Sequence, residues 1–156
     1  MTELIRISNI ENYNMVIING ELILTPNKIY ITPNKIYITE NDLKSTKIKK
    51  STIENCLIKK GEETISTKKK YQSVLIDIWK SMPTQKIKQT TTFNFKSTKE
   101  YGHLGYNWCS DINMSFQNKD ATSTLNEIVK MVKENNMSIN LSIKLETGKI
   151  VNFKIE

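Results

Sequence analysis

The sequence predicts an α+β fold, in which a two-layer α/β sandwich with an antiparallel sheet follows an N-terminal β-meander. Segments after residue 90 alternate apolar and polar side chains, as strands with one buried face do. Two longer segments repeat apolar residues with a helical period, and the first third of the chain is rich in turn signals and β-prone side chains. We therefore expect a β-rich part at residues 1–66 and the sandwich at 67–156, packed as one structural unit.

The N-terminal meander begins with a predicted hairpin. Residues 14–18 and 21–24 are β-prone and flank Asn19-Gly20. This dipeptide is the strongest short hairpin signal, because both of its positions accept a positive φ. Residues 52–59 and 63–66 are expected to form a second hairpin.

A perfect tandem repeat follows the first hairpin. Residues 26–32 and 33–39 share the sequence Pro-Asn-Lys-Ile-Tyr-Ile-Thr. Proline and asparagine favour turns and Ile-Tyr-Ile favours a strand, so we expect short antiparallel strands joined by Thr-Pro-Asn-Lys turns. Two copies are too few for a solenoid, so a duplication that lengthened a hairpin explains the repeat better.

Two amphipathic helices are predicted in the second half. The first starts near Thr67 and ends before Pro83. Its apolar stripe consists of Tyr71, Val74, Leu75, Ile78, Trp79 and Met82. The second starts at Asp120, which can cap free N–H groups, and ends at Asn135-Asn136, which allow a left-handed exit. Its apolar face consists of Ala121, Leu125, Ile128, Val129 and Val132.

Four strands complete the predicted sandwich, at residues 92–96, 106–117, 139–145 and 151–155, with a turn at Thr147-Gly148. Each has one apolar face and one face of Asn, Ser, Thr and Lys. The order α-β-β-α-β-β indicates helices on one side of the sheet and water on the other. We expect one core, made of Val74, Ile78, Phe93, Trp108, Leu125, Val129, Val132, Leu141, Ile143 and Phe153.

The net charge of +7 is concentrated in the middle of the chain. Residues 44–99 contain 14 lysines and four acidic residues, a local charge of +10, whereas the nine basic and twelve acidic residues elsewhere give −3. Such asymmetry is typical of a surface that meets a polyanion. The alternative is a solvated lysine surface. Of the 23 basic residues only Arg6 is not lysine, a bias that codon usage in an AT-rich viral, phage or bacterial genome also produces.

Eight lysines are the candidate contacts to nucleic acid or another polyanion: Lys47, Lys49, Lys50, Lys68, Lys69, Lys70, Lys86 and Lys88. Residues 68–70 are expected in the first turn of a helix, where cations oppose the macrodipole, so their placement points to a role other than stability. The near-absence of arginine predicts backbone contacts with low sequence specificity. Base stacking on the open sheet face is not expected, because the strand aromatics share the face of Ile and Leu.

The sequence contains no recognisable catalytic motif. His103 is the only histidine, and a Cys-His pair with Cys109, placed beside Asp111 on the polar face of its strand, could activate a thiolate. These are the only candidate catalytic residues, and loop histidines and isolated thiols are common without such a role. The cysteines and the histidine lack the spacing of a zinc site, and no glycine-rich phosphate loop occurs. We expect no metal, no cofactor and no enzymatic activity.

The leading hypothesis is therefore a non-catalytic binding protein whose basic middle segment engages nucleic acid or an acidic protein surface. The alternative is a protein–protein interaction or structural module, such as a viral, phage or bacterial accessory protein. It would use the open sheet face or the edge strands, through which a homo-oligomer could also form. The chain shows neither a membrane-spanning stretch nor a signal peptide, so we expect no membrane partner and a location in the cytoplasm, or inside the host cell for a viral protein.

Overall fold

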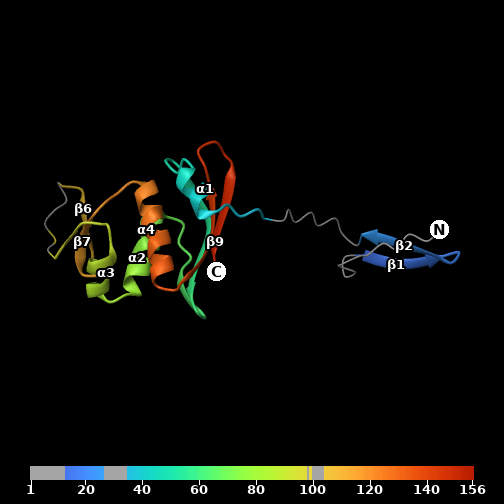
Figure 1. Ribbon diagram of the computed structural model, residues 1–156, viewed down its shortest axis with the longest axis horizontal. Helices are drawn as coiled ribbons and strands as arrows, with labels where there is room; N and C mark the ends of the chain where they lie inside the picture. Colours follow the sequence, from blue (N-terminus) through green and yellow to red (C-terminus); the bar gives the residue numbers. More distant parts are fainter. Residues whose placement is uncertain (1–12, 27–34, 98, 100–103) are drawn as a thin grey trace. The chain divides into compact units, whose positions relative to one another are not determined.

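The computed structural model describes residues 13–26, 35–97, 99 and 104–156 (Figure 1). The chain divides into two compact units, residues 1–34 and 35–156. The described residues combine helices with antiparallel sheets, which confirms the α+β class. Among them, no helix is both long and apolar enough to cross a membrane.

The first unit contains the predicted hairpin. Strand β1 (Tyr13–Ile18) pairs antiparallel with β2 (Glu21–Pro26), and Ile18 lies opposite Glu21. The two-residue turn has φ of 52° at Asn19 and 83° at Gly20. Positive φ at both positions matches the twist of the flanking strands, so the Asn-Gly prediction is confirmed. Residues 27–34, which hold most of the first repeat copy and the start of the second, lie outside the described residues.

The second repeat copy leads into a helix that the sequence pattern does not predict. Its expected strand is reduced to a single parallel bridge between Tyr37 and Asn152, where the Ile38 N–H donates to the Asn152 carbonyl at 2.8 Å. Thr39 is then the N-cap of α1 (Glu40–Ser45). A capping box fixes this start, because the Thr39 side chain accepts from the Asp42 N–H at 3.1 Å and the Asp42 carboxylate accepts from the Thr39 N–H at 3.3 Å.

The larger sheet has four antiparallel strands. In spatial order they are β4 (Glu63–Ser66), β3 (Thr52–Lys60), β8 (Ser138–Lys144) and β9 (Ile150–Ile155). The predicted hairpin at 52–66 is thus present, and it extends the sheet formed by the last two strands. One face of the sheet is apolar and carries the buried side chains of Ile58, Ile139, Leu141, Ile143, Val151 and Phe153.

Three further helices follow: α2 (Tyr71–Lys80), α3 (Thr84–Thr90) and α4 (Ala121–Glu134). Helix α4 starts as predicted, with the Asp120 carboxylate accepting from the Ser123 N–H at 2.7 Å, and Asn136 leaves it with φ of 53°. Helix α2 begins only at Tyr71. The prediction that lysines 68–70 form its first turn is therefore wrong, although they lie immediately before it.

The smaller sheet has three strands, in the order β5 (Phe95–Lys96), β7 (Met114–Gln117) and β6 (Tyr106–Cys109). The single strand expected at 106–117 is wrong, because these residues form a hairpin in which Cys109 lies opposite Met114. Asn113 adopts φ of 53°, a left-handed conformation that asparagine tolerates in turns.

The second unit therefore has three layers rather than one sheet with helices on one side. In Figure 1 the helices α2 and α4 lie between the sheet that contains β9 and the sheet that contains β6 and β7. The expected order α-β-β-α-β-β is not confirmed, since the strands divide between two sheets. The predicted core residues are all buried except Trp108, which is partly exposed.

Candidate polyanion-binding surface

A basic hollow lies where the N-terminal ends of α2 and α4 meet. The Gln72 side chain in the first turn of α2 donates to the Asn118 side chain, two residues before the N-cap of α4, at 3.1 Å. The hollow has a volume of about 340 Å³ and is lined by Ser51, Thr52, Ile53, Lys69, Lys70, Tyr71, Gln72, Lys119, Ala121 and Thr124. We call this site the basic hollow. Three lysines line it, at the positive ends of two helix dipoles.

The start of α2 lacks a capping acceptor. Lys70 occupies the N-cap position, and no side chain accepts a hydrogen bond there. Lysine has no acceptor atom and cannot cap its own helix. The first turns of α2 and α4 also contain no acidic residue, although Asp120 caps α4 from outside. The N–H groups at the start of α2 thus lack a side-chain acceptor, and the first N–H groups of a helix are a general binding site for an oxyanion.

Lysines 47, 49 and 50 lie in a short anchored turn just before Ser51, which lines this hollow, but they do not line it themselves. Ile48 is buried between them, and its carbonyl accepts from the Ser51 N–H at 2.9 Å. The Ser51 hydroxyl also lies 2.6 Å from the Tyr71 hydroxyl, which ties the turn to the start of α2. The three lysines are exposed, and Lys50 forms an ion pair with Glu146 at 3.2 Å.

Lys119 is the member of the site that sequence analysis missed. It is separated from Lys70 by most of the second half of the chain, and only the packing of α2 beside α4 brings the two together. Its ammonium donates to the Thr92 carbonyl at 2.8 Å and lies 4.8 Å from the centroid of the Phe93 ring. Lys119 thus extends the basic surface from the hollow toward the segment between α3 and β5.

The two lysines of α3 belong to a different region. Lys88 lines a second hollow of about 520 Å³, together with Thr91, Phe93, Asn94, Phe95, Lys96, Ser97 and Tyr106. Lys86 is exposed on the same helix but does not line this second hollow. Because Phe93 lines the second hollow and also contacts Lys119, the two regions adjoin.

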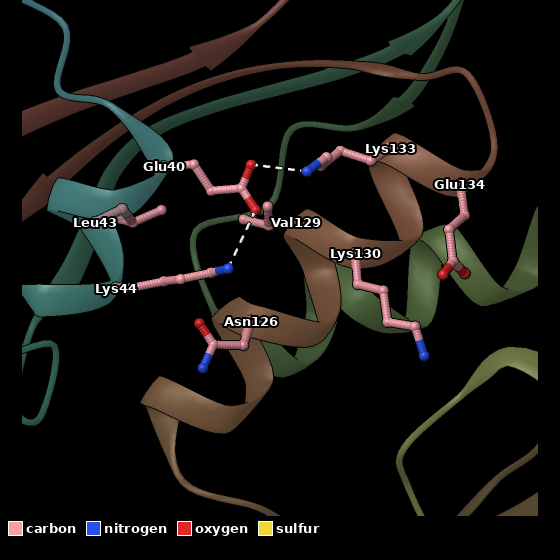
Figure 2. A pocket seen from close by; sticks show the side chains of 8 residues that line it. All are labelled: Glu40, Leu43, Lys44, Asn126, Val129, Lys130, Lys133 and Glu134. Atoms are coloured by element: carbon pink, nitrogen blue, oxygen red, sulfur yellow. Dashed lines mark hydrogen bonds and ion pairs between the residues drawn. The ribbon is translucent and has the colours of Figure 1, made fainter.

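Figure 2 shows a third hollow, of about 410 Å³, between α1 and α4. Three of its charged side chains are mutually paired: the Glu40 carboxylate accepts from Lys133 at 2.9 Å and lies 3.6 Å from the Lys44 ammonium. The hydrogen bond from Lys133 lowers the pKa of Glu40. Since Leu43 of α1 is buried in the core, this paired cluster fits the attachment of α1 to α4 better than the capture of an anion.

The catalytic candidates are not brought together among the described residues. His103 lies outside them. Cys109 is buried, so its expected position on a polar face is wrong, and Asp111 is exposed and pairs with Lys80 at 3.5 Å. In the part of the chain that the structure describes, no group of three or more His, Cys, Asp or Glu side chains could hold a metal ion.

The reactivity of the Cys56 thiol tests whether this side chain is buried. Burial raises the pKa of its thiol from 9.0 to about 11, and the nearby Asp77 carboxylate adds to the shift. At pH 8 we therefore expect about a hundredfold less thiolate than for an ordinary cysteine. In a Cys109→Ala variant, an aromatic disulfide reagent should modify folded Cys56 at least about a hundredfold more slowly than unfolded Cys56. Equal rates would show that Cys56 is accessible.

Comparisons of the chain with family models, with curated proteins and with solved structures returned no match. We therefore infer the function from the chemistry of the chain's own residues.

Proposed function

We propose that this chain is a non-catalytic protein that binds nucleic acid, or another polyanion, through the basic hollow and the lysines beside it. Lysine is a compact cation on a flexible stem, which suits contact with phosphates but not bidentate recognition of a base. Binding is accordingly expected to depend on the backbone of the nucleic acid and to vary little with its sequence.

The observation that carries the proposal is the surplus of positive charge at the start of α2. Lysines 68–70 precede an uncapped helix whose first turn has no acidic residue, and Lys119 lines the same hollow. A cation beside the start of a helix opposes its dipole, by about 0.3–1 kcal/mol at low ionic strength within the first turn and by less outside it. A bound phosphate would offset this cost, since its oxygens can accept from the N–H groups that no side chain caps and from the ammonium groups at once.

Charge-matched variants test the proposal. We expect Lys69→Gln, Lys70→Gln and Lys119→Gln together to weaken binding of a mixed-sequence DNA duplex at least about tenfold, because three phosphate contacts are lost. The control replaces Lys35, Lys60 and Lys154, which are exposed and line neither the basic hollow nor the second hollow, and should change the affinity by no more than about twofold. Fluorescence anisotropy measures both affinities, and circular dichroism checks that both variants fold.

Two outcomes of this experiment would contradict the proposal. Equal losses in the two triple variants would show that only the net charge matters, and not the basic hollow. Absence of binding by the unsubstituted protein at low salt, to duplex and single-stranded DNA alike, would end the nucleic-acid hypothesis.

A second candidate function is that of a protein-interaction module, and the open face of the larger sheet favours it. A hollow of about 410 Å³ there is lined by Tyr37, Leu57, Ser138, Ile139, Asn140, Lys154, Ile155 and Glu156. Leu57 is 39% exposed and Ile150 is 53% exposed, although both lie on strands of this sheet. The DNA titration separates the two functions, since a module of this kind has no need of the three lysines of the basic hollow.

A further inference from the structure

The outer face of the smaller sheet carries aromatic side chains that sequence analysis assigned to the core. The register places Phe95 opposite Phe116, and both rings contact Trp79, at centroid distances of 5.0 and 5.2 Å. This row therefore faces the core. In the next row, Ser115 lies between Lys96 and Trp108 on the neighbouring strands. This row must face away from the core, because side chains alternate along a strand.

Tyr106 lies on the same outer face as Trp108, since the two are separated by one residue of β6. Both rings are partly exposed, whereas the neighbouring Cys109 is buried on the core side. We call Tyr106 and Trp108 the outer aromatic pair. Their positions are about 6.6 Å apart along the strand, roughly twice the 3.4 Å between stacked bases in one strand of a duplex. Successive bases can therefore reach both rings only in a stretched, unpaired strand.

Lysines surround the outer aromatic pair. The Lys99 ammonium lies 5.2 Å from the centroid of the Trp108 ring, and Lys96 is in the same row of the sheet. Lys88 and Lys96 line the second hollow together with Tyr106. Through Phe93 and Lys119 this hollow adjoins the basic hollow. Lysines thus line both adjoining hollows between the start of α2 and the outer aromatic pair.

We propose that the outer face of the smaller sheet binds unpaired bases of single-stranded nucleic acid, which stack on Tyr106 and Trp108 while Lys88, Lys96 and Lys99 contact the phosphates. Aromatic rings beside a basic groove are the general means of holding a single strand without sequence preference. The inference rests on the proposed function, because the basic hollow supplies the adjoining phosphate contacts. It narrows the ligand from any polyanion to a single strand.

The test measures binding of oligodeoxythymidine and oligouridine of about 12 nucleotides, with a DNA duplex as the comparison. Trp108→Ala and Tyr106→Ala should each weaken single-strand binding roughly 5- to 150-fold, the range found for loss of one stacked base. Duplex binding should be unchanged within about twofold. Trp108→Phe and Tyr106→Phe keep an aromatic face and should retain most of the affinity. Tyr37→Ala, at the edge of the other sheet, is the matched control and should have no effect.

Tryptophan fluorescence gives a second measurement that does not depend on a destabilised variant. The chain has two tryptophans, and Trp79 is fully buried, so quenching by an added oligonucleotide reports Trp108. We expect either oligonucleotide to quench the tryptophan fluorescence of the unsubstituted protein. The Trp108→Phe variant should show no such quenching. If both single strands bind but neither quenching nor the alanine variants respond, the stacking face is wrong while the proposed function stands. If neither the single strands nor the duplex bind, the proposed function itself fails.

Discussion

Replacing Trp79 with alanine is expected to lower the free energy of unfolding by about 3–5 kcal/mol, the usual cost of removing a buried tryptophan or phenylalanine side chain. The Trp79 side chain has no exposed surface. Its ring meets Phe93, Phe95 and Phe116 edge-on at 5.4, 5.0 and 5.2 Å, and so joins α2 to the smaller sheet. Small domains are stable by only about 5–15 kcal/mol, so this loss would bring the protein close to unfolding at room temperature.

Urea unfolding followed by circular dichroism measures this effect, with Trp108→Ala as the matched control. The control removes a side chain of the same size from a partly exposed position, and it should cost well under half as much. Trp79→Phe should fall between the two, because it keeps an aromatic ring but leaves a cavity. Equal losses for Trp79→Ala and Trp108→Ala would contradict the assignment of Trp79 to the core and of Trp108 to the outer face.

Elements with a clear period and capping signal could be predicted from the sequence. Helix α4 has both, since Asp120 caps its start and Asn136 provides the left-handed exit. Helices α1 and α3 have too few buried residues to show a period: Leu43 is the only buried residue of α1, and Ile87 the only one of α3. The capping box of α1 also starts at the last residue of an Ile-Tyr-Ile-Thr segment, which by itself favours a strand.

One turn explains why the sequence pattern predicts the wrong faces for the strands of the smaller sheet. In a continuous strand, Trp108 and Met114 would share a face, since Met114 lies six positions after Trp108 and side chains alternate with a period of two. In the hairpin, Cys109 lies opposite Met114, and residues opposite each other point to the same side. The four residues between these partners reverse the alternation, which buries Cys109 and turns Trp108 outward. The turn is not apparent from the sequence, because Ile112 within it is apolar and buried and so continues the alternating pattern of a strand.

The candidate site was predictable only where it is local in sequence. Lys69 and Lys70 are visible as a run of lysines, but nothing near residue 119 indicates that Lys119 would line the same hollow. Lys119 lies near Lys69 and Lys70 because the N-terminal ends of α2 and α4 lie side by side, and this arrangement is a property of the fold. Conversely, the sequence suggests one group of lysines that includes Lys86 and Lys88, but these two lie on α3, in another region.

The largest effect expected on binding is its dependence on salt. Three phosphate contacts in the basic hollow contribute a slope of about −2.7 to a plot of log affinity against log salt for duplex DNA. Between 50 and 200 mM salt these contacts alone would reduce the affinity about 40-fold. An uncharged mode of binding, such as an apolar protein interface, has no comparable dependence.

The decisive measurement is this salt titration, made with the unsubstituted protein and with the triple variant at Lys69, Lys70 and Lys119. We expect a steep salt dependence for the former and a slope that is flatter by about 2 to 3 for the latter, with the slope of the Lys35, Lys60 and Lys154 control unchanged. If the slopes of all three proteins are equal, or if none of them binds DNA at 50 mM salt, the basic hollow is not a polyanion-binding site.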